Sequence, residues 1–182
     1  MRIRLAKAFL NDAEARHNRA VNELLTQDKI VIFTGAKKVS DIRSDIRDHK
    51  FAILIIDYLQ LLICTDRYKG NRVSEVGELS RELKDLAMSF NIPILALSQL
   101  NRASEGRQNK EPLMSEIRES GSIEQDASII FIMWDKDTDD RSQKGFKTEK
   151  SRNGVCARYD LVFDGPSMKF KGENQVSPFE GR

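Results

Sequence analysis

The sequence predicts an α/β fold with a mostly parallel sheet flanked by helices and an antiparallel hairpin at the carboxyl end. Short apolar runs alternate with segments of helical spacing up to residue 134, an order typical of parallel strands joined by helices. The longest run, 51–56, is unbroken and predicts a strand buried on both faces. After residue 145, strand-like segments are separated by turns at Asn153-Gly154 and Gly165-Pro166, as in a hairpin.

Helices are predicted where apolar residues recur three or four positions apart, or where helix-forming residues are uninterrupted. They span 3–25, 38–48 and 73–90, with shorter helical pieces over 114–126. Val39, Ile42 and Ile46 mark one face of the second helix. The third helix has the longest apolar face: Val76, Leu79, Leu83, Leu86, Ala87 and Phe90. Asn91 and Pro93 end this helix.

Strands are predicted at the apolar runs, and polar or charged segments separate them. Before the hairpin the runs cover 29–34, 51–56, 92–98 and 128–134, and the hairpin strands cover 145–151, 157–163 and 167–171. Loops are expected at 64–72, 101–112 and 135–144. We therefore expect one domain over 1–172, followed by a carboxyl-terminal tail over 173–182.

The composition excludes some classes of protein. The longest apolar run is far shorter than the roughly 20 residues of a membrane span, and the segment after Met1 is charged, so neither a span nor a signal peptide is predicted. Cys64 and Cys156 have no metal or redox spacing, as expected in a reducing cytosol. The formal net charge of +2 neither requires nor excludes nucleic acid, so any basic surface must be local.

Two polar residues each follow one of two neighbouring apolar runs. They would lie at the carboxyl ends of the strands, where open α/β sheets bind ligands. Asp57 follows the run 51–56 and could hold the Mg²⁺ of a bound triphosphate. Gln99 follows the run 92–98 and could sense a γ-phosphate or its water, because an amide both donates and accepts. The alternatives are an aspartate that caps the next segment and an ordinary polar residue of a turn.

A third motif is the segment Arg118-Glu-Ser-Gly-Ser-Ile-Glu-Gln-Asp126. Gly121 and Ser122 would let backbone amides approach a bound anion, and Arg118 would add positive charge. The alternative is a junction between two helices in which Ser122 caps the second one.

A fourth motif is Lys150-Ser-Arg152-Asn-Gly154. Its two cations are one residue apart in a predicted strand and therefore point to the same face. They precede a turn that requires a positive φ at Gly154, an arrangement that suits reaching across an interface toward phosphates. The alternative is a pair of solvated cations that protect an edge strand from pairing.

Together and in this order, IIDYLQLL, ALSQLNR, RESGSIEQDA and KSRNG resemble the RecA-like motor domain of the DnaB-family replicative DNA helicases, over roughly residues 1–170. The resemblance implies a partial RecA-like P-loop NTPase core and an ATP-dependent DNA helicase that uses ATP and Mg²⁺. It implies a hexameric ring that unwinds duplex DNA by moving 5′ to 3′ along single-stranded DNA. Primase and a helicase loader are possible partners through parts outside this chain. The expected location is the cytoplasm, at the nucleoid or replisome, or the host cytoplasm for a phage protein.

The resemblance also implies roles around ATP. Asp57 would be the Walker B carboxylate that orders Mg²⁺, and Gln99 would be the sensor of the γ-phosphate. Lys150 and Arg152 would form a pair that acts in trans, with Arg152 as the arginine finger in a neighbour's ATP site.

For DNA, the resemblance places Arg118, Glu119 and Gly121 on the loop that holds the single-stranded backbone in the channel of the ring. The loop 65–72 is a second candidate for facing that channel.

The resemblance breaks at the P-loop, Gly-x-x-x-x-Gly-Lys-Ser/Thr, because this sequence contains no Gly-Lys dipeptide. The family's strand and helix that carry the P-loop, its water-activating glutamate and its amino-terminal domain are also missing. We expect this chain alone not to hydrolyse ATP, because the phosphates lack their amide cradle and lysine. One alternative is a non-catalytic remnant that binds single-stranded DNA or joins a ring. A further alternative is another RecA-like ATPase, such as a recombinase or clock protein, but the motif RESGSIEQDA counts against it.

Overall fold

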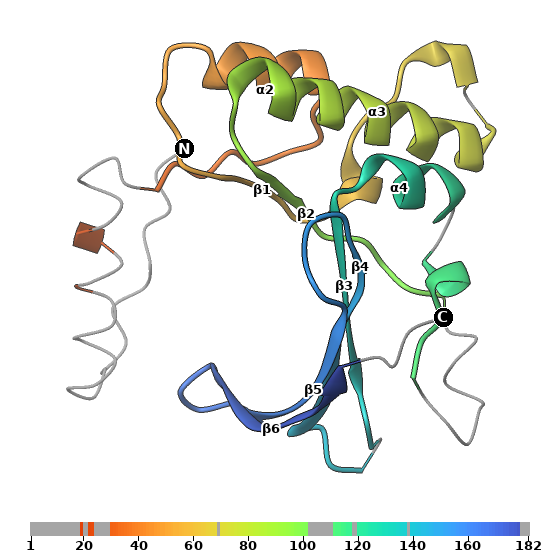
Figure 1. The fold of residues 1–182 in the computed structure, drawn as a ribbon. Coiled ribbons are helices and arrows are strands. Elements are labelled where there is room, and N and C mark those ends of the chain that lie inside the picture. The colour runs from red at the N-terminus through yellow and green to blue at the C-terminus, as the bar shows by residue number, and fades with distance from the viewer. Residues whose placement is uncertain are drawn as a thin grey trace. The chain divides into compact units, whose positions relative to one another are not determined.

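The computed structural model describes residues 19, 22, 23, 30–68, 70–101, 111–117, 120–137 and 139–178 (Figure 1). The chain divides into two compact units, 1–35 and 36–182. In the first unit, Arg19, Asn22 and Glu23 are helical, and the rest of the helix predicted over 3–25 lies outside the described residues.

The prediction of a strand over 29–34 is wrong for residues 30–34, which the structure describes. Residues 30–34 have no regular secondary structure, and no described strand pairs with them. An extended segment becomes a strand only through a hydrogen-bonded ladder, which an apolar run does not specify by itself. The side chain of Ile32 is accordingly 69% exposed.

The second unit begins with a layer of two helices on a parallel strand pair. Its elements are α2 (Val39–Ile46), β1 (Leu54–Ile56), the 3-10 turns η1 (Leu59–Leu61) and η2 (Asp66–Tyr68), α3 (Arg72–Phe90) and β2 (Ile94–Ala96). β1 and β2 pair in parallel, with Leu54 opposite Ile94 and Ile56 opposite Ala96. This is the strand–helix–strand unit that the alternation of apolar and helical segments predicted.

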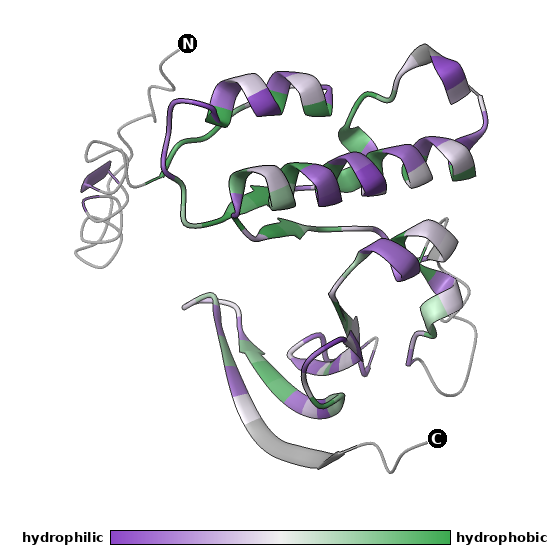
Figure 2. Ribbon diagram, turned by 45° about the horizontal axis from the view of Figure 1, so that its top comes forward, coloured by the Kyte–Doolittle hydropathy of each residue, from purple (hydrophilic) through white to green (hydrophobic). Residues whose placement is uncertain are grey.

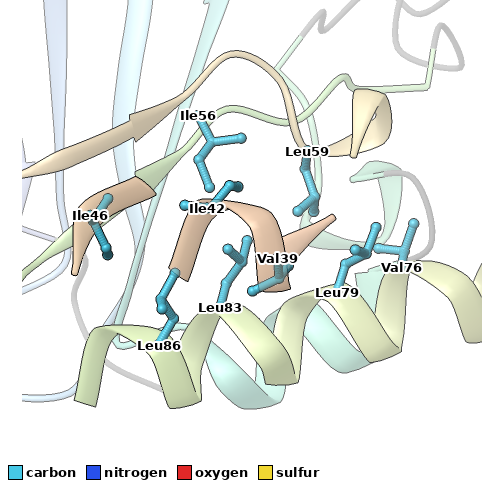
Figure 3. Close-up of a cluster of buried hydrophobic side chains, with 9 residues drawn as sticks. All are labelled: Val39, Ile42, Ile46, Ile56, Leu59, Val76, Leu79, Leu83 and Leu86. Carbon is cyan, nitrogen blue, oxygen red and sulfur yellow. The ribbon is translucent and has the colours of Figure 1, made fainter. Parts of the chain in front are cut away.

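Buried aliphatic side chains from both helices form the core of this layer (Figure 3). The predicted helices 38–48 and 73–90 are confirmed, and their predicted apolar faces are the buried ones: Val39, Ile42, Ile46, Val76, Leu79, Leu83 and Leu86. Ile56 of β1 and Leu59 of η1 complete the cluster. The αL cap Asn91 (φ 51°) ends α3 where the sequence predicted its end.

The prediction that the parallel strands are buried on both faces is wrong. Ile55 is 58% exposed and Leu95 is 44% exposed, although both strands are hydrophobic along their length (Figure 2). Because α2 and α3 pack on one face of the pair, side chains that alternate to the other face have no covering layer among the described residues.

The carboxyl-terminal part is a separate antiparallel sheet with the order β3-β4-β5-β6. The strands are β3 (Ile129–Asp135), β4 (Gln143–Ser151), β5 (Ala157–Asp164) and β6 (Lys169–Pro178). The predicted hairpin is thus confirmed and extended to four strands. The predicted helical pieces over 114–126 are the 3-10 turn η4 (Met114–Glu116) and the helix α4 (Ser120–Asp126).

The strand predicted over 128–134 is buried on one face only. Ile130, Ile132 and Trp134 are buried and pack with Ile117 in a second core, whereas Phe131 is 52% exposed. A strand with one covered face shows this alternation of buried and exposed side chains.

The predicted turn at Asn153-Gly154 is confirmed, because β4 ends at Ser151 and β5 begins at Ala157, as the predicted strands 145–151 and 157–163 require. The positive φ predicted at Gly154 is wrong, since among the described glycines only Gly35 and Gly70 have a positive φ. A connection of this length does not need the left-handed backbone of a tight turn. A Cβ at Gly154 would lie 2.9 Å from Ser151 Oγ, so the glycine allows a close approach instead.

Gly145 stands directly opposite Trp134 in the β3–β4 ladder, and a Cβ there would lie 2.2 Å from the ring atom Cζ2. We predict that Gly145→Ala lowers the free energy of unfolding by about 1–3 kcal/mol, because the indole must leave its packed position. Urea unfolding followed by tryptophan fluorescence measures this. Gly165→Ala is the matched control, since its Cβ would meet nothing within 4 Å. Equal unfolding free energies for the two variants would contradict the prediction.

Candidate functional site

The carboxyl edge of the β1–β2 pair brings together the two residues predicted to lie there. Asp57 follows β1 directly and Gln99 lies three residues beyond β2. Leu97 N donates to Ile56 O at 2.9 Å, and Leu59 N donates to Leu97 O at 2.8 Å, so the backbones stay side by side past the strand ends. Both Asp57 and Gln99 are exposed, which leaves their polar groups accessible to a ligand.

Gln60 forms hydrogen bonds across this edge, and the sequence analysis did not identify it as a site residue. Its Nε2 donates to Ser98 Oγ at 2.9 Å, and its backbone oxygen accepts from Arg72 Nη2 at 3.0 Å. Gln60 therefore connects the turn after Asp57 to the residue before Gln99 and to the start of α3. The signal that could have identified it is a polar side chain inside the apolar string IIDYLQLL.

The two cations of the fourth motif contact the same helix. Lys150 Nζ donates to Glu124 O, and Arg152 Nη2 donates to Gln125 O at 2.9 Å. Both acceptors are backbone carbonyls near the end of α4. β4 lies between β3 and β5, but its pairing with β5 ends at Lys147. Lys150 is therefore paired on the β3 side only, as in the alternative reading of an edge, although both cations also donate to α4.

The third motif is only partly described, because Arg118 and Glu119 lie outside the described residues. Gly121 is exposed in α4, and Ser122 lies inside the helix, so the alternative in which Ser122 caps a helix is wrong. α4 packs closely on α3, since a Cβ at Gly77 would lie 2.7 Å from Ser122 Oγ.

A pocket of about 510 Å³ joins the third and fourth motifs. The side chains and backbone around it come from η4, α4 and β4: Met114, Gly121, Glu124, Gln125, Glu149 and Lys150. The glycine of the proposed DNA loop and the lysine of the proposed trans pair therefore line the same space.

The loop 65–72 is bound to α3 at both ends. Thr65 Oγ1 donates to the Glu78 carboxylate at 2.7 and 2.8 Å. At the other end, Gly70 N donates to Glu75 Oε1 at 3.0 Å, and Arg72 forms an ion pair with Glu75 at 3.0 Å. Of the cations in this loop, Arg72 is thus paired with a carboxylate, which weakens its attraction for a phosphate.

No group of three or more histidine, cysteine, aspartate or glutamate side chains in the described residues could hold a metal ion by itself. The exposed carboxylate of Asp57 nevertheless fits Mg²⁺, which usually takes one or two carboxylates together with substrate phosphates and waters. Within the same residues, no helix is both long and apolar enough to cross a membrane.

Comparisons with known proteins agree on one family. The model of the DnaB-like helicase C terminal domain matches residues 2–172. The replicative DNA helicase DnaC of Bacillus subtilis is 44% identical over 146 residues, which cover 75% of this chain and 32% of that protein. The replicative DNA helicase DnaB of Buchnera aphidicola is 37% identical over 179 residues, which cover 92% and 38%.

Two solved structures share the fold. One is an ATPase domain with a TM-score of 0.77 and 31% identity, covering 91% of this chain and 62% of that one. The other is a DnaB-like replicative helicase, solved for its interactions with primase, with a TM-score of 0.73 and 32% identity, covering 86% and 41%. The RecA-like α/β fold is therefore confirmed. The chain spans 32% to 38% of the length of the two curated helicases.

Cys64 provides a pH-dependent test of the site's surroundings. Burial raises the pKa of its thiol to about 11, and the hydrogen bond to the Glu78 carboxylate and the charge of that carboxylate add to the effect. At pH 8 only about one thiol in a thousand is then ionised, so alkylation should be slow. We predict that Glu78→Gln lowers the pKa and accelerates labelling of Cys64 by iodoacetamide, measured by peptide mass spectrometry from pH 7 to 10. Glu82→Gln, one turn along α3, is the control. Equal rates in the two variants would contradict the assignment.

Proposed function

The chain belongs to the DnaB-like helicase C-terminal domain family, and from this premise we propose that it is the motor part of an ATP-dependent replicative DNA helicase. The observation that carries the proposal is the family match over residues 2–172. The parallel strand ends that present Asp57 and Gln99 on one edge support it. We further propose that residues 1–172 belong to the partial motor domain. The tail predicted over 173–182 is wrong for 173–178, because β6 pairs with β5 as far as Pro178.

For ATP, we propose that Asp57 orders Mg²⁺ and that Gln99 senses the γ-phosphate. An exposed carboxylate can accept hydrogen bonds from the water ligands of Mg²⁺, and an amide can both donate to a phosphate oxygen and accept from a water. In such a reaction the bound ATP and Mg²⁺ would supply the transferable phosphoryl group and its charge neutralisation.

In a hexameric ring, Lys150 and Arg152 would reach into the ATP site of the neighbouring subunit. A guanidinium can stabilise charge that develops on the transferred phosphoryl group, which is the role of an arginine finger. Lys150 lies in β4 opposite Ile130 of β3, and Arg152, one residue beyond β4, donates its backbone N to Ser128 O at 3.0 Å. These backbone contacts support the role, because they hold both residues on the sheet.

For DNA, we propose that Arg118, Glu119 and Gly121 belong to the loop that holds the single-stranded backbone. Movement 5′ to 3′ along that strand would then separate the duplex. Primase and a helicase loader are proposed partners of the longer protein, since one structural relative is a DnaB-like replicative helicase solved for its interactions with primase. The proposed location is the cytoplasm, at the nucleoid or replisome, or in the host for a phage protein.

A second candidate function is a non-catalytic module that binds single-stranded DNA or joins a helicase ring. The absence of a Gly-Lys dipeptide favours it for this chain alone, because a phosphate cradle is then missing. The proposed DNA loop and trans pair would still serve in that role.

The DNA proposal predicts salt-dependent binding of single-stranded DNA without nucleotide. Fluorescence anisotropy with a labelled oligothymidylate should give an affinity that falls with rising salt. Arg118→Ala should weaken binding and make the slope against log salt shallower by about 0.7, the value for one phosphate contact on a single strand. Lys169→Ala, which changes an exposed cation of β6, is the control. If Arg118→Ala binds as tightly as the unchanged chain, the proposed DNA loop is wrong.

For ATP, we predict no turnover by the purified 182-residue chain. Phosphate release with Mg²⁺, with and without oligothymidylate, should equal the background of the Asp57→Ala variant. The physical reason is that the phosphates have no amide cradle and no P-loop lysine. Turnover that Asp57→Ala abolishes would show that the reasoning from the missing P-loop is wrong.

A further inference from the structure

Few hydrogen bonds hold the stretch of chain that carries Gln99. Before it, Leu97 forms two backbone hydrogen bonds with β1 and η1, at 2.9 and 2.8 Å. After it, the next backbone contact is an isolated bridge at Leu100. Between these two points, the described residues supply one further hydrogen bond, which Gln60 Nε2 donates to Ser98 Oγ at 2.9 Å. This bond therefore holds the residue directly before Gln99.

Gln60 is itself held in place, so its side chain acts from a fixed base. Leu59, directly before it, is only 3% exposed and belongs to the aliphatic core. The backbone oxygen of Gln60 accepts from Arg72 Nη2 at 3.0 Å, and Arg72 forms an ion pair with Glu75 at 3.0 Å. A side chain whose surroundings are fixed in this way positions its own partner more accurately than a side chain of a free loop does.

Ser98 sets the orientation of the Gln60 amide. The Oε1 atom of this amide is buried and has no hydrogen-bond partner among the described residues, whereas Nε2 donates to Ser98 Oγ. An amide can accept as well as donate, but none of the described residues provides a second partner here. Loss of the Ser98 hydroxyl would therefore leave the amide without a hydrogen bond in this part of the chain. The bond thus fixes both of its ends.

The proposed sensing role depends on this restraint. An amide that distinguishes a γ-phosphate must stay within about 0.5 Å and 10–20° of its productive position. Gln99 is exposed, so burial does not confine its side chain. Its direction depends on the backbone at Ser98, because a small rotation there moves the end of the following side chain much further. Gln60 is the described side chain that restrains this backbone.

We propose that Gln60 is a positioning residue for Gln99: through its hydrogen bond to Ser98 it holds the sensor amide toward the proposed Mg²⁺ and γ-phosphate. This inference rests on the proposed function, which assigns Asp57 to Mg²⁺ and Gln99 to the γ-phosphate. It adds Gln60 and Ser98 to the site as a pair that acts through Gln99 and touches neither the metal nor the nucleotide. The physical link is one side-chain hydrogen bond between the two strand ends.

The first arm of the test uses no ligand and measures the order of the Gln99 backbone amide by ¹⁵N relaxation. In the unchanged chain the order parameter should be about 0.85, the value of rigid backbone. Gln60→Leu and Ser98→Ala each remove the hydrogen bond, and each should lower the parameter to below about 0.6. The double variant should lower it no further, because the two changes remove the same interaction. Ser98→Thr keeps the hydroxyl and should keep the order.

Ser89→Ala is the matched control, since it also removes a hydroxyl hydrogen bond, from Ser89 Oγ to Asp85 O in α3. It should leave the order parameter of Gln99 unchanged. A parameter that neither Gln60→Leu nor Ser98→Ala lowers would overturn the positioning role.

The second arm measures whether the restraint acts at the proposed metal site. Mn²⁺ alone stands in for Mg²⁺, and its paramagnetic broadening is compared for the backbone amide of Tyr58 and the side-chain amide of Gln99. Both signals should broaden in the unchanged chain, and neither should broaden in Asp57→Ala. In Gln60→Leu the broadening of Gln99 should be lost while that of Tyr58 stays, a result that a general loss of structure would not give. Ser98→Thr should behave like the unchanged chain.

Broadening of Gln99 that persists in Gln60→Leu would overturn the inference. Absence of broadening near Asp57 in the unchanged chain would instead contradict the proposed function, and the first arm would still decide whether Gln60 holds Ser98 and Gln99 in place.

Discussion

The in-register pairing of β1 with β2 is the constraint on which the candidate ATP site depends. It brings together residues that are distant in sequence, such as Gln60 and Ser98, which are 38 positions apart. The pairing itself depends on α3, because the helix must return the chain for β2 to run parallel to β1. Fully buried Val76, Leu79 and Leu86 fix the helix against α2 and the strands. The exposed polar residues at the strand ends therefore depend on this core for their positions.

The antiparallel sheet has a different anchor, a buried ionic cluster beside Trp134. Lys147 has a side chain only 3% exposed and pairs with Glu111 at 3.2 Å and Glu149 at 2.7 Å. Arg158 pairs with the same Glu111 at 2.6 Å, and both cations lie over the Trp134 ring, at 6.0 and 5.5 Å. A buried charge is tolerated only when it is paired, so this cluster fixes β3, β4 and β5 relative to Glu111. Because Lys147 lies three residues before Lys150 in β4, the same ion pairs also restrain the end of this strand.

The sequence predicted the elements whose signals are local. The apolar spacing of α3 and the stop at Asn91 identify the helix and its end without knowledge of its partners. Burial on both faces of β1 was wrong because an apolar run does not say how many layers cover it. The hydrogen bond from Gln60 to Ser98 and those from Lys150 and Arg152 to α4 were missed for a related reason. They join segments through a side chain and a backbone carbonyl or hydroxyl, and no spacing rule encodes such pairs.

The described residues supply only part of what the proposed ATP site needs. Asp57 supplies one carboxylate, and a single carboxylate cannot complete the octahedral shell of Mg²⁺, so the phosphates and waters must supply the remaining ligands. The phosphates in turn need cations, and those at the end of β4, Lys150 and Arg152, donate to α4. Under the proposed function, Asp57 and the two cations would therefore have to be supplemented by a P-loop, which this sequence does not contain. The cations would also have to leave the carbonyls of α4 before they could reach a phosphate of a neighbouring subunit.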